Sequence, residues 1–183
     1  MKRKILFQTF VFFLLIEILN SKIIKGFDIQ DYSNFESIQQ DELISSIDDF
    51  INLPKGGVPW KVFGDTGMDE YTFTDEEGND WLGFRPLFTK EIKKLDAKEI
   101  LVQGYMFPLD QGEGQSLFLL GPFPLTCPYH PHTSSNLTIE VSAKIPITFS
   151  YEPVNVKGQL ELVPKDDLYN VFFRLKNAEL VPD

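Results

Sequence analysis

The sequence predicts a mainly β protein, a small barrel or sandwich with an N-terminal helix and one short internal helix. Two observations support this fold class. Short β-prone segments follow one another closely from residue 58 onward, separated by turns rich in glycine, proline and acidic residues. Residues 154–162 alternate apolar and polar side chains with period two, which is typical of a strand with one buried face.

The N-terminal helix is predicted over residues 34–51. Ser33 and Glu36 match a capping box, in which the Ser caps the helix and the Glu follows three residues later. Apolar residues then recur at roughly helical spacing until Pro54 and the glycines after it end the helix. We expect a packing or tethering helix. The short internal helix is predicted over residues 88–95, with Thr89 as its N-cap.

The predicted strands are short and regularly interrupted. Gly104, inside one of them, is expected to mark a bulge or a close approach of two backbones. The acidic turn at 75–80 does not have the spacing of a calcium loop and is interpreted as a solvated hairpin tip. Aromatic side chains at strand positions are expected mostly in the core, and a pocket lined by Trp60, Trp81, Tyr105 and Phe123 is the alternative. The predicted strands are 58–63, 71–74, 81–84, 100–107, 116–120, 137–141, 145–149, 154–162 and 171–176.

The first 26 residues predict export. Lys2, Arg3 and Lys4 precede an apolar stretch at 5–19, which is shorter than the roughly 20 residues that a membrane span needs and suits a secretory signal. An uncleaved N-terminal anchor is the alternative, and Glu17 at the end of the apolar stretch disfavours it. We therefore expect a periplasmic or secreted protein that meets a membrane only through this segment if it stays uncleaved.

The net charge excludes one class of partner. Removing residues 1–26 takes away five of 17 basic and one of 27 acidic residues, so the net charge becomes −14. A chain this acidic is repelled by the phosphate backbone, and a nucleic-acid partner is not expected.

The segment Cys-Pro-Tyr-His-Pro-His contains Cys127, His130 and His132, the only cysteine and the only histidines of the chain. In an extended segment the two histidines point the same way, about 6.6 Å apart at Cα. A thiolate and two imidazoles suit zinc or copper. Three protein ligands and an open position favour transport, sensing or catalysis over a purely structural site.

Other roles for this cluster remain open. Cys127 is alternatively a buried packing thiol beside two exposed loop histidines, or a reactive thiol. A catalytic cysteine needs a base within reach and a group that orients the base. No carboxylate stands at a recognisable spacing, so the sequence does not favour an enzyme.

Several blocks of the sequence together resemble a bacterial family. They are Val-Gln-Gly-Tyr-Met-Phe-Pro-Leu at 102–109, Phe-Leu-Leu at 118–120, Pro-Leu-Thr-Cys-Pro-Tyr at 124–129, Ile-Glu-Val at 139–141 and Val-Asn-Val-Lys-Gly at 154–158. The chain resembles domain-of-unknown-function family 3299 over roughly residues 60–181. The resemblance implies an exported protein with a small OB-like β-barrel and implies no activity. Many members have Cys-Pro-Phe-Cys where this chain has His130 as the last residue, which puts a dithiol redox role in doubt and leaves a metal role intact.

The expected organisation is a signal peptide or anchor at 1–26, an N-terminal helix and linker at 27–57, and an OB-like barrel domain at 58–183. The predicted function is that of a non-enzymatic accessory or binding protein of the cell envelope with a zinc or copper site at Cys127, His130 and His132. A metal-free module that binds an envelope protein through residues 121–131 and the adjacent barrel face is the alternative. A thiol-based redox factor is less favoured. Asn136 begins a glycosylation sequon, but we do not expect it to be glycosylated in an exported bacterial protein.

Overall fold

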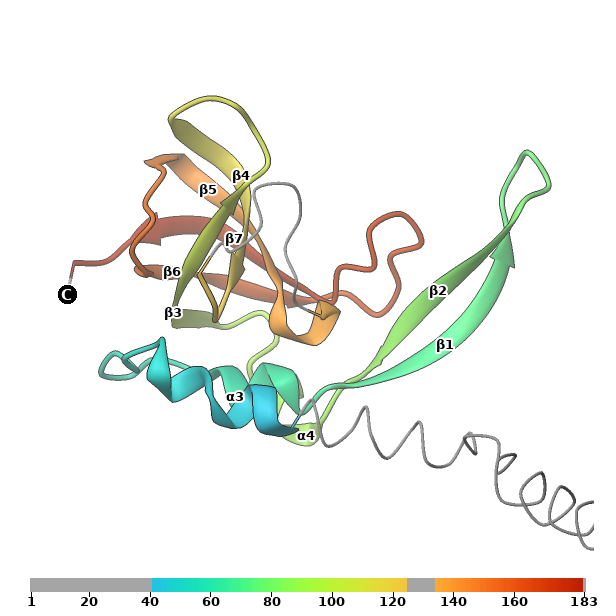
Figure 1. Cartoon of the computed structure of the whole chain (residues 1–183), viewed down its shortest axis with the longest axis horizontal. Helices are drawn as coiled ribbons and strands as arrows, with labels where there is room; N and C mark the ends of the chain where they lie inside the picture. The colour runs from blue at the N-terminus through green and yellow to red at the C-terminus, as the bar shows by residue number, and fades with distance from the viewer. Residues whose placement is uncertain (1–40, 125–133, 183) are drawn as a thin grey trace, which may run out of the picture. The chain divides into compact units, whose positions relative to one another are not determined.

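The computed structural model describes residues 41–124 and 134–182 (Figure 1). The chain divides into two compact units, 1–42 and 43–183, and the elements named below belong to the second except for the helical residues 41 and 42. The export segment, the first part of the predicted N-terminal helix and the cluster of Cys127, His130 and His132 lie outside the described residues. Within those residues, no helix combines the length and the apolar character needed to cross a membrane.

Five strands form a closed barrel, which confirms the predicted fold class. They are β3 (Glu99–Pro108), β4 (Gly114–Gly121), β5 (Ile139–Thr148), β6 (Val154–Leu162) and β7 (Phe173–Leu180). Their order around the barrel is β3-β4-β5-β7-β6, and β6 pairs with β3 to close it. All neighbours are antiparallel except β5 and β7, which are parallel. This Greek-key arrangement is that of an OB fold.

The predicted strands at 137–141 and 145–149 are two halves of one strand, β5. It pairs with β4 at Ser142↔Leu117 and again at Ile147↔Gln115, so β5 advances five residues while β4 advances two. Extra residues in one strand interrupt the ladder locally, and Pro146 has no N–H to contribute there. The break between the two predicted strands coincides with this irregularity in β5, so the sequence indicated its position but not its nature.

One end of the core is filled by the short helix α3 (Trp60–Gly64), where we had predicted a strand at 58–63. That prediction was wrong because the burial of Trp60 and Phe63 overrides the β propensity of the segment. Residues three apart share one face of a helix, and both of these side chains enter the core. The Trp60 indole Nε1 donates a hydrogen bond to the Gln103 carbonyl (2.7 Å), and the Phe63 ring meets Phe173 edge-to-face at 5.1 Å.

A 3₁₀ turn, η2 (Ser135–Leu137), ties α3 to the start of β5. The fully buried Asn136 amide donates to the carbonyls of Gly64 (2.8 Å) and Thr66 (3.1 Å). The same amide is the one that a glycosylation enzyme would have to reach. Its burial describes the folded protein, and the absence of modification stays a prediction.

Both predicted helices have counterparts. Residues 41–45 are helical and a 3₁₀ turn, η1 (Ile47–Asp49), follows them, with Ile47 and Ile51 in the core. The internal helix α4 (Lys90–Lys93) is shorter than predicted. Its N-cap is Thr89, as expected, and the Thr89 hydroxyl accepts a hydrogen bond from the Ile92 N–H at 3.3 Å.

A separate two-stranded sheet is formed by β1 (Gly67–Thr74) and β2 (Asp80–Leu87), seen in green in Figure 1. The strands pair from Gly67↔Leu87 to Thr74↔Asp80 without a register shift. The acidic segment 75–80 is the turn of this hairpin, as predicted, and Gly78 adopts a positive φ of 86° within it.

Candidate functional site: an apolar groove on the barrel

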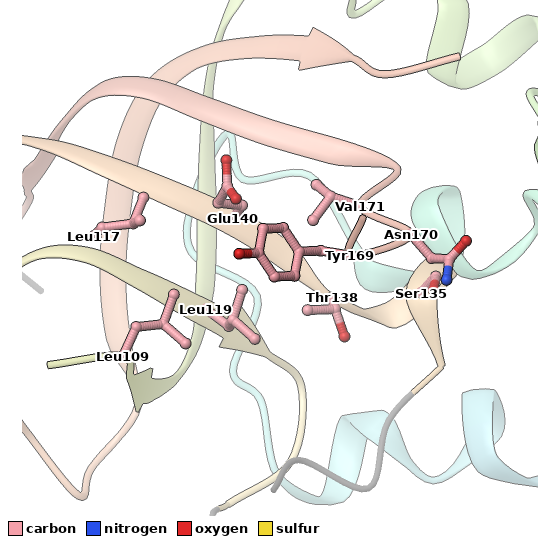
Figure 2. A pocket seen from close by; sticks show the side chains of 9 residues that line it. All are labelled: Leu109, Leu117, Leu119, Ser135, Thr138, Glu140, Tyr169, Asn170 and Val171. Atoms are coloured by element: carbon pink, nitrogen blue, oxygen red, sulfur yellow. The ribbon is translucent and has the colours of Figure 1, made fainter. Parts of the chain in front are cut away.

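A groove lies on the outer face of the barrel where β4 and β5 run side by side (Figure 2). It has a volume of about 480 Å³, and two loops, β3–β4 and β6–β7, also contribute to it. We call this site the leucine groove. Its lining residues are Leu109, Leu117, Leu119, Ser135, Thr138, Glu140, Tyr169, Asn170 and Val171.

Strand β4 is apolar on both of its faces. Successive side chains of a strand point to opposite sides, so Phe118 and Leu120 fill the core while Leu117 and Leu119 face outward into the groove. Leu117 is 43% exposed and Leu109 is 54% exposed. Apolar side chains gathered in a concave surface mark sites of binding more often than isolated exposed leucines do. The continuous apolar run 117–120 is thus explained by a core face and a binding face.

The wall opposite the leucines comes from the β6–β7 loop. Its Tyr169 side chain is 71% exposed and lies across the groove (Figure 2). The Asp166 carboxylate holds the loop by accepting hydrogen bonds from the N–H groups of Leu168 and Tyr169, both at 3.0 Å. Asn170 follows in a left-handed conformation with φ of 54°, which asparagine tolerates better than most residues. The exposed tyrosine therefore stands on an ordered turn.

The carboxylate that lines the groove, that of Glu140, is already paired with an arginine. Arg174 on β7 binds Glu140 through Nε at 2.7 Å and Asp166 through Nη2 at 2.8 Å. Burial alone would lower the pKa of Arg174, but the hydrogen bond to Glu140 and the charges of Glu140, Asp166 and Glu161 raise it above its ordinary value. Arg174 therefore stays charged and anchors the loop to the barrel through its bonds to both carboxylates.

Two other polar side chains of the lining are also engaged in hydrogen bonds. The Asn170 side-chain oxygen accepts a hydrogen bond from the Phe84 N–H at 2.9 Å, and the Thr138 hydroxyl donates to the Ser134 carbonyl at 3.1 Å. What the groove offers to a ligand is therefore mainly apolar surface. Such a surface suits the binding of an apolar group.

The three predicted metal ligands cannot be placed, because 125–133 lies outside the described residues. Across the parts of the chain that are described, no three His, Cys, Asp or Glu side chains are grouped so as to hold a metal ion. The predicted site at Cys127, His130 and His132 thus stays a prediction. Along the sequence it adjoins the groove, since Ser135 comes three residues after His132.

The expectation that the aromatic residues are core residues holds for some of them. Trp60 is 2% exposed, and Tyr105 and Phe123 pack against the core. For Trp81 the expectation is wrong, since its side chain is 55% exposed on the hairpin. A hairpin outside the barrel has no interior to receive it.

Comparison with known proteins places the chain in a family. The family model described as "Protein of unknown function (DUF3299)" matches residues 76–181, and the chain belongs to this family. The matched range includes all five barrel strands and the groove. A crystal structure of a DUF3299 family protein from Pseudomonas aeruginosa PAO1 is 24% identical, with a TM-score of 0.41 over 50% of this chain and 66% of that chain. No curated protein matches the sequence.

Proposed function

We propose that this member of the DUF3299 family is an exported, non-enzymatic binding protein of the cell envelope, and that the leucine groove receives an apolar segment of a partner protein. The observation that carries the proposal is the exposure of Leu109, Leu117 and Tyr169 around one concave surface. In OB folds the second and third strands and the loops beside them form the ligand-binding face. Here those strands are β4 and β5.

The chemistry of the groove favours a polypeptide over a nucleic acid. No lysine or arginine is among the lining residues, and the chain as a whole is acidic. Full burial of a leucine contributes about 1.5–3 kcal/mol, and these leucines are already partly covered. Association itself costs several kcal/mol, so the groove alone supports a binding event of modest affinity.

Export is the second part of the proposal. It is supported by the three basic residues at 2–4 and the apolar stretch that follows them. Cell fractionation and N-terminal sequencing of the mature protein test it. A mature chain that begins after residue 20 and is found outside the cytoplasm is the expected result, and an uncut chain in the cytoplasm would contradict it.

Site-specific photo-crosslinking in the producing cells tests the groove. A photoreactive residue replaces Leu117, which lines the groove, or Ile145, which is an exposed apolar residue of β5 outside it. We expect a defined adduct from position 117 that is absent from position 145 and is lost when Tyr169→Asp is added. The same adducts from both positions, or none from position 117, would exclude the groove as the binding site.

A metal site at Cys127, His130 and His132 is the second candidate function. It is favoured by the confinement of every cysteine and histidine of the chain to six residues. Elemental analysis of protein purified without chelators should find about one zinc or copper per chain, and Cys127→Ala should lose it. Absence of metal from the wild-type protein would mean that Cys127 is an ordinary thiol and that His130 and His132 are not metal ligands. The groove would then be the remaining candidate site.

A further inference from the structure

Three aromatic side chains of the β1–β2 hairpin, those of Tyr71, Phe73 and Trp81, lie on the same face. Register pairs Phe73 with Trp81 and Tyr71 with Gly83, so these residues point to the same side. The Tyr71 and Phe73 rings are 5.9 Å apart, and Tyr71 lies across Gly83 so closely that a Cβ there would be 2.7 Å from the ring. We call this side, with Arg85 at its base, the aromatic face.

Trp81 is held in place although it is exposed. Its indole Nε1 donates a hydrogen bond to Asp75 Oδ2 at 2.7 Å. Asp75 also accepts bonds from the N–H groups of Glu77 (3.0 Å) and Asn79 (2.8 Å), so the acceptor is fixed by the turn itself. The polar edge of the indole is therefore satisfied, and 55% of the side chain remains open to a ligand.

The hairpin is strongly acidic. Residues 67–87 contain six acidic side chains and one basic side chain, which gives a net charge of −5. The hydrogen bonds from Trp81 and then from the Asn79 N–H lower the pKa of Asp75 to about 2, so this carboxylate is ionised at neutral pH. The acidic residues are Asp69, Glu70, Asp75, Glu76, Glu77 and Asp80.

Two cationic side chains of the chain itself already lie over the ring of Tyr71 on this face. The Arg85 guanidinium stacks on the Tyr71 ring, with Cζ 4.1 Å from the ring centroid, and the Lys165 ammonium lies 5.6 Å from the same centroid. In the described part of the chain, no cation lies over the ring of Trp81. Tryptophan is the aromatic side chain that binds cations best.

We propose that the aromatic face and the acidic tip of the hairpin bind an arginine-rich stretch of another polypeptide. A guanidinium stacks on Trp81 as Arg85 stacks on Tyr71, and neighbouring arginines pair with Glu76 and Glu77 at the tip. Charge argues for this occupant, because nucleic acid, an anionic membrane and a second acidic hairpin are all repelled. The proposal does not rest on the leucine groove.

Titration of the mature chain with an octa-arginine peptide at about 150 mM salt tests the proposal. Fluorescence of the exposed Trp81 reports binding at the hairpin, and calorimetry gives the affinity. Two pairs of variants separate local binding from general attraction to an acidic protein. Trp81→Ser is compared with Tyr151→Ser, an exposed aromatic outside the hairpin. The double change of Glu76 and Glu77 to Gln is compared with the change of Asp48 and Asp49 to Asn, another exposed adjacent pair.

We expect Trp81→Ser to weaken binding by about two- to fivefold, the range of an exposed cation–π contact. The variant of Glu76 and Glu77 should weaken binding by a similar factor because it loses two exposed ion pairs, while both controls leave binding unchanged. An octa-lysine peptide should bind more weakly than octa-arginine. Equal losses in hairpin and control variants would overturn the proposal in favour of nonspecific attraction. A dimer that sedimentation finds in wild-type protein and not in Trp81→Ser would overturn it by making a second copy the occupant.

Discussion

The barrel and the hairpin contain the same kinds of β-prone residue but bury them to different extents. In the barrel every strand pairs on both sides, and Val156 and Phe173 are fully buried. In the hairpin each strand has one described partner, and Trp81 and Leu82 are more than half exposed. The difference teaches that closure of the sheet, more than the identity of a β-prone residue, decides whether that residue is core or surface.

The two parts are also held by different interactions. The barrel is stabilised by its apolar core, whereas a two-stranded hairpin by itself is only marginally stable in water. Two hydrogen bonds join the hairpin to the β6–β7 loop: Tyr71 OH donates to Asp167, and the Phe84 N–H donates to Asn170 Oδ1. The same loop forms a wall of the leucine groove. We therefore expect the hairpin to open without unfolding of the barrel.

The largest effect is expected from truncation of the barrel core. Phe173 is fully buried against the rings of Phe63, Phe88 and Phe172. Phe173→Ala should lower the free energy of unfolding by about 3–5 kcal/mol, which chemical denaturation measures. Leu82→Ala in the hairpin is the control and should change it by less than about 0.5 kcal/mol. Comparable losses from both changes would mean that hairpin and barrel unfold as one unit.

A smaller loss of stability is expected when a side chain is added where strands β3 and β4 approach closely. A Cβ on Gly104 would lie 2.8 Å from both the Gly121 carbonyl oxygen and Leu120 Cγ. Gly104→Ala should therefore overpack this crossing and lower the free energy of unfolding by about 1–3 kcal/mol. Gly112→Ala, in the β3–β4 loop where the nearest atom would be 3.8 Å away, is the matched control. A stable Gly104→Ala protein would show that the strands can separate at little cost.

Local sequence signals predicted the features that local interactions form. The Thr89 cap, the acidic turn at 75–80 and the close approach at Gly104 each follow from the residues that make them. The helix at Trp60 could not be predicted in this way, because its stability depends on contacts with residues distant in the sequence, such as the contact of Phe63 with Phe173. The apolar run at 116–120 predicted a strand but not the groove, although Leu117 and Leu119 extend that run beyond what one buried face needs. Nothing in the sequence placed Tyr169 beside them.

A local effect is expected from removing one of the two hydrogen bonds between the hairpin and the β6–β7 loop, the bond from Tyr71 to Asp167. Tyr71→Phe removes the hydroxyl that donates to Asp167 and keeps the ring under Arg85. Hydrogen exchange of the hairpin amides should become faster, while the barrel amides keep their protection. Tyr151→Phe, which removes another exposed hydroxyl, should leave both sets unchanged. Faster exchange throughout the barrel would show that the anchor supports the whole fold.

The smallest effect is a pH dependence confined to the hairpin, and the two tryptophans of the chain make it measurable. The Trp81 indole donates to the Asp75 carboxylate, which titrates, whereas the Trp60 indole donates to the Gln103 backbone carbonyl, which does not. The bond from Trp81 and then the Asn79 N–H lower the pKa of Asp75 from 3.8 to about 2. A lowered carboxylate pKa means that this support for the turn is complete above pH 4 and is lost as the pH falls through about 2. The Trp81 indole N–H resonance should follow that transition in the NMR spectrum, and Asp75→Asn should abolish it, while the Trp60 resonance stays unchanged. A midpoint near 4 would show that the indole does not hold the carboxylate, and a transition shared by both resonances would report acid unfolding of the barrel and hairpin together.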